Sequence, residues 1–356
     1  EPPSQGRAVG KSLNVIVFFS EGLSARTLAP YDELIPGLTP NMDSFARESM
    51  RVDNYYNHTY ATYRGLHGQL CSLFPARGGH GGWHTHYDDI KSTDYLCLNN
   101  LFSDAGYHST FIDTHRRDEA YVDEMMQMLG FDEVITAEDI PRSYTSGEPL
   151  RPDSLSDNQL MDGLVGMLDS GDFSQSGNPF FIALYNLETH AWQDVAADGV
   201  RFGDGKNPIL NAIHNYDHAF GRFWNYFRES PYFSNTAVIF TADHAHYNDD
   251  GFVRLVRGQA DYRPYFVDRI PLMIYLPGGG LPESHDAARA TSIDFAPSMA
   301  HLFGLTNRSN PFLGHSIFEI RDRGPGMQNP GGIAAAGDRF FVIGETGPQA
   351  YSWDDP

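Results

Sequence analysis

Short runs of almost continuously apolar residues recur along the chain, and polar residues follow most of them. Runs of this kind are typical of strands buried on both faces, as in a parallel sheet that lies between two layers of helices. They occupy residues 13–19, 107–112, 180–185, 237–241 and 272–275. We therefore predict an α/β fold with a mostly parallel central sheet flanked by helices.

The segments between these runs carry helical signals. Thr39 is placed to cap a helix whose first residue is Pro40, because proline is favoured at the first helical position. Apolar residues recur at helical spacing over residues 160–168 and 210–227, which predicts amphipathic helices that pack on the sheet.

The end of the chain is expected to form a small appendage. Glycine-rich stretches at residues 78–82 and 324–332 are expected to be mobile loops. The second stretch leads toward a predicted strand at residues 339–343, which would belong to a short antiparallel piece. We therefore divide the chain into one large domain over residues 1–320 and a C-terminal appendage over residues 321–356.

The composition limits the partners of the chain. Its 356 residues carry a formal charge of −21, which argues against nucleic acid because that partner is bound through Lys and Arg. The longest apolar run, residues 15–19, is far too short to cross a bilayer. The first residues lack the basic and apolar regions of a signal peptide, so an export signal has been removed or was never present. Cys71 and Cys97 fit either one disulfide in an oxidising compartment or two buried thiols.

Metal-ligand and proton-transfer side chains follow the predicted strands. Functional residues of open α/β sheets gather beyond the carboxyl ends of the strands. A single acidic residue there is usually a turn former or a helix cap, but the conjunction at successive strand ends favours a site. Carboxylates and imidazoles suit Mn²⁺, Zn²⁺ or Mg²⁺. The residues in question are Glu21, His115, Arg116, His190, Asp243, His244 and His246.

An ordered set of motifs resembles the sulfatase-like enzymes of the alkaline phosphatase superfamily. Residues 14–22 (NVIVFFSEG) and 38–46 (LTPNMDSFA) are similar to the family's opening strand, metal carboxylate and helix. Residues 235–244 (NTAVIFTADH) are similar to its second metal strand, and the helix with Asp217 precedes them. Later landmarks appear in the same order at residues 269–277, 292–298 and 312–318. The resemblance covers about residues 13–320 and implies the fold predicted above.

The resemblance also points to the nucleophile. In true sulfatases a Cys or Ser within C/S-x-P-x-R becomes formylglycine, but this chain has no such motif, and residues 73–77 (LFPAR) begin with Leu. Thr62 stands at the formylglycine position, and a Thr there resembles lipoteichoic acid synthases and phosphoethanolamine transferases. Thr59 is a rival, but a predicted helix begins immediately after Thr62. The Thr62 hydroxyl would therefore lie at a helix N-terminus, where the backbone dipole favours an anion.

The family pattern implies a ligand set and an acid. Glu21, Thr62, Asp243 and His244 are expected to hold one divalent cation, with Mn²⁺ the first choice, Zn²⁺ the second, and Mg²⁺ or Ca²⁺ as alternatives. His190 matches the position that contacts the substrate phosphate, and it would protonate the leaving alkoxide.

Other polar residues are candidates for binding the substrate. Arg64, His115, Arg116 and His246 are expected at the pocket rim, and His67 is a further candidate. A histidine-rich group would either shape an acceptor site or bind metal adventitiously; it consists of His80, Trp83, His84 and His86.

These residues predict a two-step displacement in which Thr62 attacks a phosphodiester and an alcohol or water then releases the group. The leading substrates are phosphoglycerol-type phosphodiesters of lipid or glycan. Hydrolysis of a phosphomonoester or sulfate ester is the alternative within enzymes. A catalytically silent lipid or glycan sensor would be expected to lose part of the metal set, which this chain keeps. We expect an extracytoplasmic protein, periplasmic or secreted, or the soluble domain of a membrane-anchored one.

Overall fold

The computed structural model describes residues 13–32, 34–75, 88, 90–117, 119–174, 177–305, 312–319, 332–336, 339–344 and 346–352. The predicted loops at residues 78–82 and 324–331 lie outside these ranges, as does the group His80, Trp83, His84 and His86. No helix within the described ranges has the length and apolar character needed to cross a membrane.

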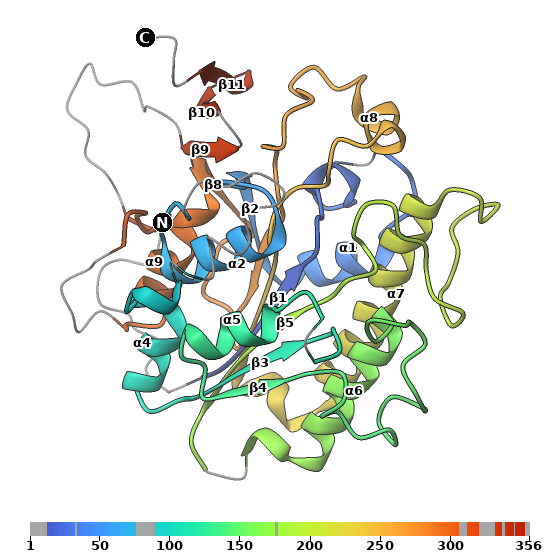
Figure 1. Ribbon diagram of the computed structural model, residues 1–356, viewed down its shortest axis with the longest axis vertical. Coiled ribbons are helices and arrows are strands. Elements are labelled where there is room, and N and C mark those ends of the chain that lie inside the picture. The colour runs from blue at the N-terminus through green and yellow to red at the C-terminus, as the bar shows by residue number, and fades with distance from the viewer. Residues whose placement is uncertain are drawn as a thin grey trace.

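An eight-stranded sheet forms the centre of the molecule (Figure 1). Its order is β4-β3-β5-β1-β6-β7-β2-β8, and every neighbouring pair is parallel except the two pairs that contain β7. The predicted mostly parallel sheet is thus confirmed. The strands are β1 (Asn14–Ser20), β2 (Met50–Tyr56), β3 (His108–Asp113), β4 (Glu133–Ile135), β5 (Phe180–Tyr185), β6 (Thr236–Ala242), β7 (Leu272–Tyr275) and β8 (Ser284–Thr291).

Helices cover both faces of this sheet (Figure 1). One layer contains α1 (Pro40–Ala46), α6 (Asp157–Ser170) and α7 (Pro208–Glu229), and the other contains α2 (Thr62–Cys71), α4 (Leu98–Asp104), α5 (Val122–Met128) and α9 (Phe295–Leu302). The helix α8 (Asp250–Val256) follows the loop after β6. Short 3₁₀ helices are η1 (Ala25–Thr27), η2 (Asp172–Ser174), η3 (Pro231–Ser234) and η4 (Ser292–Asp294).

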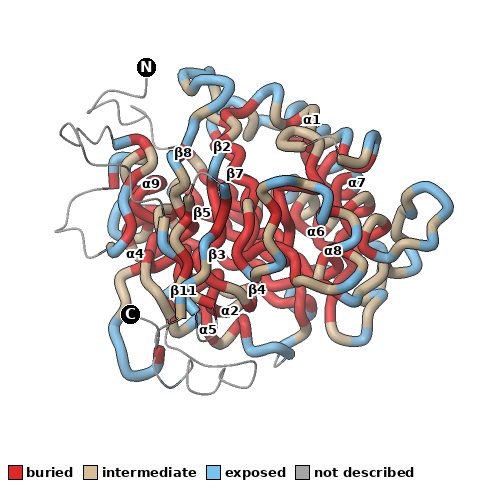
Figure 2. The backbone as a smooth tube through the Cα atoms, turned by 90° about the horizontal axis from the view of Figure 1, so that it is seen from above, coloured by how far each residue is buried: buried red, intermediate tan, exposed pale blue. Residues whose placement is uncertain are grey.

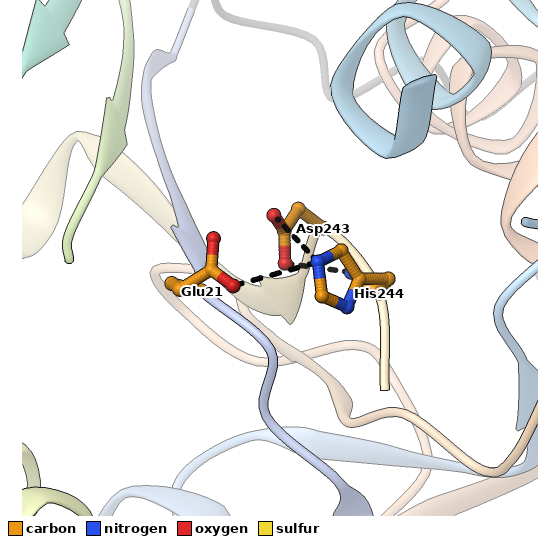
Figure 3. A group of neighbouring side chains, drawn as sticks. All are labelled: Glu21, Asp243 and His244. Carbon is orange, nitrogen blue, oxygen red and sulfur yellow. Dashed lines mark hydrogen bonds and ion pairs between the residues drawn. The ribbon is translucent and has the colours of Figure 1, made fainter. Parts of the chain in front are cut away.

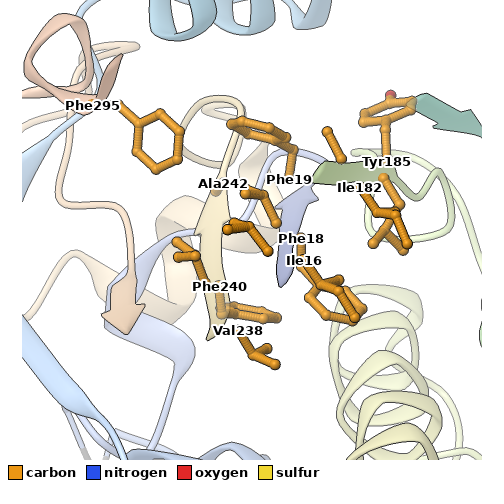
Figure 4. Close-up of a cluster of buried hydrophobic side chains, with 14 of the residues drawn as sticks. Ile16, Phe18, Phe19, Ile182, Tyr185, Val238, Phe240, Ala242 and Phe295 are labelled. Carbon is orange, nitrogen blue, oxygen red and sulfur yellow. The ribbon is translucent and has the colours of Figure 1, made fainter. Parts of the chain in front are cut away.

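The alternation of side chains along β1 joins the two helical layers to the sheet. The Phe18 ring lies 4.9 Å from that of Phe223 in α7, whereas the Phe19 ring lies 5.4 Å from that of Phe295 in α9 (Figure 4). Successive residues of a strand point to opposite faces, so one apolar strand supplies both cores. Figure 2 shows the buried residues concentrated along the sheet and the exposed ones in the outer loops.

The helix α1 begins at Pro40 after Thr39, as predicted, but its cap is supplied from elsewhere. The Thr39 hydroxyl accepts from the backbone N–H of Ala29 instead of capping the helix. Asp217 of α7 accepts from the N–H groups at the start of α1, including that of Met42 at 2.7 Å. A buried carboxylate on one helix thus satisfies the free donors of another.

A three-stranded antiparallel sheet near the end of the chain confirms the predicted antiparallel piece. It contains β9 (Ile333–Ala336), β10 (Arg339–Gly344) and β11 (Gly347–Ser352), with β10 in the middle. The backbone N–H of Ala335 donates to the carbonyl of His58 at 2.7 Å, and Phe341 packs in a small apolar cluster with Tyr56. The small sheet therefore contacts the end of β2, and the boundary after residue 320 stays a prediction.

Cys71 and Cys97 form a disulfide. Of the two sequence-based alternatives, the structure contains this one and not two thiols. The bond joins the last residue of α2 to the residue before α4. It therefore fixes the carboxyl end of the helix whose first residue is Thr62.

Candidate active site

Three central strands bring their carboxyl ends to one place on the sheet edge. Ser20 at the end of β1 pairs with Ala242 of β6, and Phe19 pairs with Tyr185 of β5. The residues that follow these strands therefore lie side by side. This is the position at which open α/β sheets place their ligands.

Glu21, Asp243 and His244 meet at this edge and are fully buried (Figure 3). Each offers a ligand atom within 4.8 Å of those of the other two. His244 Nε2 lies 3.4 Å from Glu21 Oε1 and 3.7 Å from Asp243 Oδ2. The structure thus brings together three of the four predicted metal ligands from the ends of β1 and β6.

The unused atoms of these three side chains fit a divalent cation. Glu21 Oε1, Asp243 Oδ2 and His244 Nε2 are buried and have no hydrogen-bond partner within the described part of the chain. The other polar side-chain atoms of Asp243 and His244 are already bonded. Asp243 Oδ1 accepts from the N–H groups of Gly22 and His244, and His244 Nδ1 donates to the Ala245 carbonyl. That donation leaves the Nε2 lone pair facing two carboxylates. Three buried polar atoms without a partner are unfavourable, and a divalent cation bound between them would supply the partner that they lack.

The acidities of the two carboxyl groups differ. Burial raises the pKa of Asp243 well above its usual range, and the neighbouring Glu21 carboxylate adds to that rise. Burial also acts to raise the pKa of Glu21, but two nearby histidine rings and hydrogen bonds from Tyr185 and Thr62 outweigh it, so this pKa is lowered. The site therefore favours one negative charge, and positive charge is needed before both carboxyl groups ionise readily.

Thr62 is the first residue of α2, and its hydroxyl donates to Glu21 Oε2 at 2.8 Å. It is half-buried. Thr59 lies in the loop before the helix, and its backbone carbonyl accepts from Asn57 Nδ2 at 2.6 Å. The structure thus places Thr62, and not Thr59, against the Glu21 carboxylate at a helix N-terminus.

The position of α2 depends on its contact with the loop that follows β6. Gln69 Nε2 donates to the carbonyls of Ala242 and Asp243 at 2.8 and 2.9 Å. A Cβ atom added to Gly65 would lie only 2.3 Å from the Asp243 carbonyl oxygen. Only glycine therefore allows this helix to approach the metal-ligand loop so closely. Sequence reasoning missed both residues, although a glycine one turn after Thr62 was a usable signal.

Tyr185 is a further site residue that sequence reasoning missed. Its hydroxyl donates to Glu21 Oε2, the oxygen that also accepts from Thr62. Burial and the Glu21 carboxylate both raise the pKa of Tyr185, so it remains a donor. Two hydroxyls thus occupy one oxygen of Glu21 and leave Oε1 for a cation. The signal was its position as the last residue of a strand that otherwise appeared only apolar.

His190 lies after β5 and outside the group of three ligands. Its Nδ1 donates to the Ala191 carbonyl at 2.8 Å, which leaves Nε2 available for a substrate. Its ring centroid lies 5.4 Å from that of Tyr247, whose ring is 4.9 Å from that of His244. His190 is therefore a neighbour of the metal ligands without being one of them.

The predicted rim residues His115 and Arg116 lie on the β3 side of the site. His115 is buried, stacks on the Tyr185 ring with centroids 5.7 Å apart, and donates from Nδ1 to Asp113 at 2.8 Å. Burial lowers the pKa of His115, but Asp113 outweighs burial and the pKa is raised. Arg116 Nε is buried without a hydrogen-bond partner in the described ranges.

His246 and Arg64 are held by the protein itself. The two ring nitrogens of His246 contact the Gly22 carbonyl at 3.1 Å and Asp249 Oδ2 at 2.9 Å, so neither is left for a substrate. We therefore interpret His246 as a residue that positions the loop after β1. Arg64 is buried in α2, with its guanidinium 5.3 Å from the Tyr63 ring centroid.

Replacing Gly65 tests the contact between α2 and the ligand loop. We expect Gly65→Ala to lower the free energy of unfolding by about 1–3 kcal/mol, because the added methyl group overpacks a buried backbone contact. Metal affinity should fall as well, since the backbone of Asp243 must shift. Urea unfolding and calorimetric metal titration measure the two effects. Gly258→Ala is the matched control, because nothing lies within 4 Å of that position; equal stabilities of the two variants would contradict the close approach.

Comparison with known proteins identifies the family of this chain. The sulfatase family model matches residues 13–305. Phosphoglycerol transferase I of Escherichia fergusonii is 23% identical over 85% of this chain and 38% of its own length. That of Xanthomonas euvesicatoria is 24% identical over 66% of this chain and 34% of its own length. The chain thus spans about two fifths of the length of these relatives, or less.

Solved structures share the fold. The lipoteichoic acid synthase LtaP from Listeria monocytogenes has a TM-score of 0.72 at 17% identity, with 99% of this chain and 89% of that chain covered. An alkaline phosphatase superfamily protein from Vibrio parahaemolyticus has a TM-score of 0.72 at 19% identity, with 97% and 80% covered. The PsFucS1 sulfatase from Pseudoalteromonas has a TM-score of 0.62 at 14% identity, with 96% and 82% covered. Because the sulfatase family model matches well over half of the residues, this chain belongs to the sulfatase family.

Proposed function

We propose that the chain is a metal-dependent enzyme that transfers or hydrolyses phosphodiesters with Thr62 as the nucleophile. The observation that carries this proposal is the hydrogen bond from the Thr62 hydroxyl to Glu21 at the start of α2, beside three buried atoms that lack a partner within the described ranges. Glu21, Asp243 and His244 would hold the cation, and Thr62 is near enough to Glu21 to join them. Mn²⁺ is our first choice and Zn²⁺ the second, because both accept carboxylate and imidazole ligands.

When bound, the cation would supply positive charge to the phosphoryl oxygens and make a neighbouring hydroxyl more acidic. The protein supplies the remaining parts. Glu21 orients the Thr62 hydroxyl, and the N-terminus of α2 favours the negative charge of the phosphoryl group. The Thr62 hydroxyl passes its proton to Glu21 Oε2 as Oγ1 bonds to phosphorus and the bond to the leaving alcohol breaks, and His190 gives that alcohol its proton. An alcohol or water then gives a proton to His190 and displaces Thr62, which recovers its own proton from Glu21 as the group is released.

The substrate class follows from two further observations. The chain has Thr62 where a true sulfatase would need a convertible Cys or Ser, and it lacks the C/S-x-P-x-R motif. Its relatives include proteins named phosphoglycerol transferase I. Phosphoglycerol-type phosphodiesters of lipid or glycan are therefore our proposed substrates, ahead of phosphomonoesters and sulfate esters. The complete set of three buried ligands argues against a silent sensor on this fold.

We also propose an extracytoplasmic location, either as a periplasmic or secreted protein or as the soluble domain of a membrane-anchored one. The Cys71–Cys97 disulfide supports this, because such bonds persist in oxidising compartments.

Metal content tests the ligand set. We expect purified protein to retain a divalent cation after dialysis, and Asp243→Ala to lose it because the site then lacks one of its three buried protein ligands. Elemental analysis by mass spectrometry measures occupancy. Asp204→Ala, which removes an exposed carboxylate, should keep full occupancy. Full occupancy and activity in Asp243→Ala would refute the assignment.

Thr62→Ala should abolish turnover of bis(p-nitrophenyl) phosphate while the fold and most of the metal affinity remain, since it removes the attacking oxygen. Thr62→Ser should recover part of the rate because it restores a hydroxyl at the same position. Thr59→Ala is the control and should have much less effect. The opposite ranking of the two alanine variants would move the nucleophile to Thr59.

His190→Ala should keep the cation but lower the rate by about a hundredfold to ten-thousandfold if His190 is a general acid. The loss should shrink for substrates with a nitrophenol leaving group, which needs little protonation. Steady-state rates for a nitrophenyl and an alkyl phosphodiester measure the difference. Equal losses would exclude the acid role and leave phosphate binding, and loss of metal would make His190 a ligand.

A further inference from the structure

Aromatic rings extend from the metal ligands to the protein surface. The Tyr247 ring lies 4.9 Å from that of His244 and 5.6 Å from that of Trp192. Tyr247 is buried, whereas Trp192 is 70% exposed and is the most exposed large hydrophobic side chain within the described ranges. The indole ring of Trp192 is therefore exposed to solvent, and the Tyr247 ring lies between it and the proposed metal ligand His244.

A second pair of rings continues from the other side of Tyr247. The Phe266 ring stacks on that of Tyr60 with centroids 4.5 Å apart, and it lies 6.0 Å from that of Tyr247. Phe266 is 36% exposed. We call Trp192, Tyr247, Phe266 and Tyr60 the aromatic rim. The small C-terminal sheet supports it, because Phe341 of β10 packs against Tyr265, the residue before Phe266.

The backbone around Trp192 is held in place. Trp192 has a φ of 67°, in the left-handed region that bulky residues avoid. The guanidinium of Arg151 donates to the carbonyl of Asp194 at 3.2 Å and to the side chain of Gln193. The buried Glu188 accepts from the N–H of Ala196 at 2.7 Å. An exposed indole kept in a strained backbone conformation beside the candidate site is a candidate binding position.

We propose that the aromatic rim is a subsite for a neutral sugar ring, so that the substrate or the acceptor of the proposed reaction is a glycan. This inference rests on the proposed function only where it identifies the bound sugar as part of the substrate or acceptor of that reaction. A sugar ring has an apolar face that can stack on indole and an edge of hydroxyl groups. The loop beside Trp192 offers the amide nitrogen of Gln193 as a donor for those hydroxyls, because Arg151 holds the oxygen of that amide.

Other occupants fit less well. An acyl chain needs a continuous apolar surface, but Trp192 and Phe266 are the rim's only members among the exposed large hydrophobic residues of the described ranges. Nucleobases also stack on tryptophan, but they come with phosphates that a chain of formal charge −21 repels. The same charge disfavours an anionic lipid surface. A neutral sugar ring needs no continuous apolar surface and carries no negative charge, so these arguments do not apply to it.

Direct binding tests this subsite without any need for turnover. Isothermal titration of the full chain with maltohexaose and cellohexaose, which are neutral α- and β-linked glucans, should show binding of at least one. Trp192→Ala should weaken that binding about tenfold or more, as expected for an exposed aromatic anchor, and Trp192→Phe should weaken it less. Leu313→Ala, which removes another exposed apolar side chain (59% exposed), is the control and should bind like the wild type.

The outcomes separate this inference from the proposed function. Trp192-dependent glucan binding that persists in Thr62→Ala supports the subsite, even if no phosphodiesterase activity is found and the proposed function fails. Absence of binding by both glucans in a protein that turns over bis(p-nitrophenyl) phosphate overturns the subsite alone. Equal binding by Trp192→Ala and the wild type also overturns it. Trp192-dependent binding to phosphatidylcholine vesicles in place of the glucans would assign the rim to a lipid.

Discussion

One electrostatic constraint governs the edge of the sheet where the strands have their carboxyl ends. Glu21, Asp243 and the lone pair of His244 Nε2 face one another there in the interior. Such a group is costly to bury because each member prefers a donor or a positive charge. The backbone N–H groups of Gly22 and His244 bind the other oxygen of Asp243, so they cannot relieve this. A cation bound between these three side chains would relieve this cost.

The helix α2 transmits that constraint to the proposed nucleophile. Its first residue bonds to Glu21, its middle packs on the Asp243 backbone through Gly65 and Gln69, and its last residue is tied to the loop before α4 by the disulfide. The helix has little freedom to slide or rotate. The hydroxyl of Thr62 is therefore positioned by the same elements that position the ligands, which is what a reaction between a fixed nucleophile and a bound phosphate requires.

Much of this edge could be predicted because buried parallel strands are apolar throughout, so the first polar residue after each one marks the edge. β2 was missed because polar residues interrupt it, and its Arg51 and Asp53 pair with each other at 2.8 Å. β8 was missed because it lies at the edge of the sheet and only two of its eight residues are buried. The partners of individual side chains could not be predicted either. Spacing places His246 near the site, but only the folded structure shows that both its nitrogens are occupied.

The negative charge of the site affects how a phosphodiester could bind there. A phosphodiester is an anion, the chain carries a formal charge of −21, and the two carboxylates would repel the substrate at short range. The groups that could attract a phosphate are the N-terminus of α2 and the guanidinium of Arg116, whose Nε lacks a partner within the described residues. Under the proposed function, a cation held by Glu21, Asp243 and His244 would offset this repulsion, so the same ion would serve both recognition of the phosphate and its chemistry.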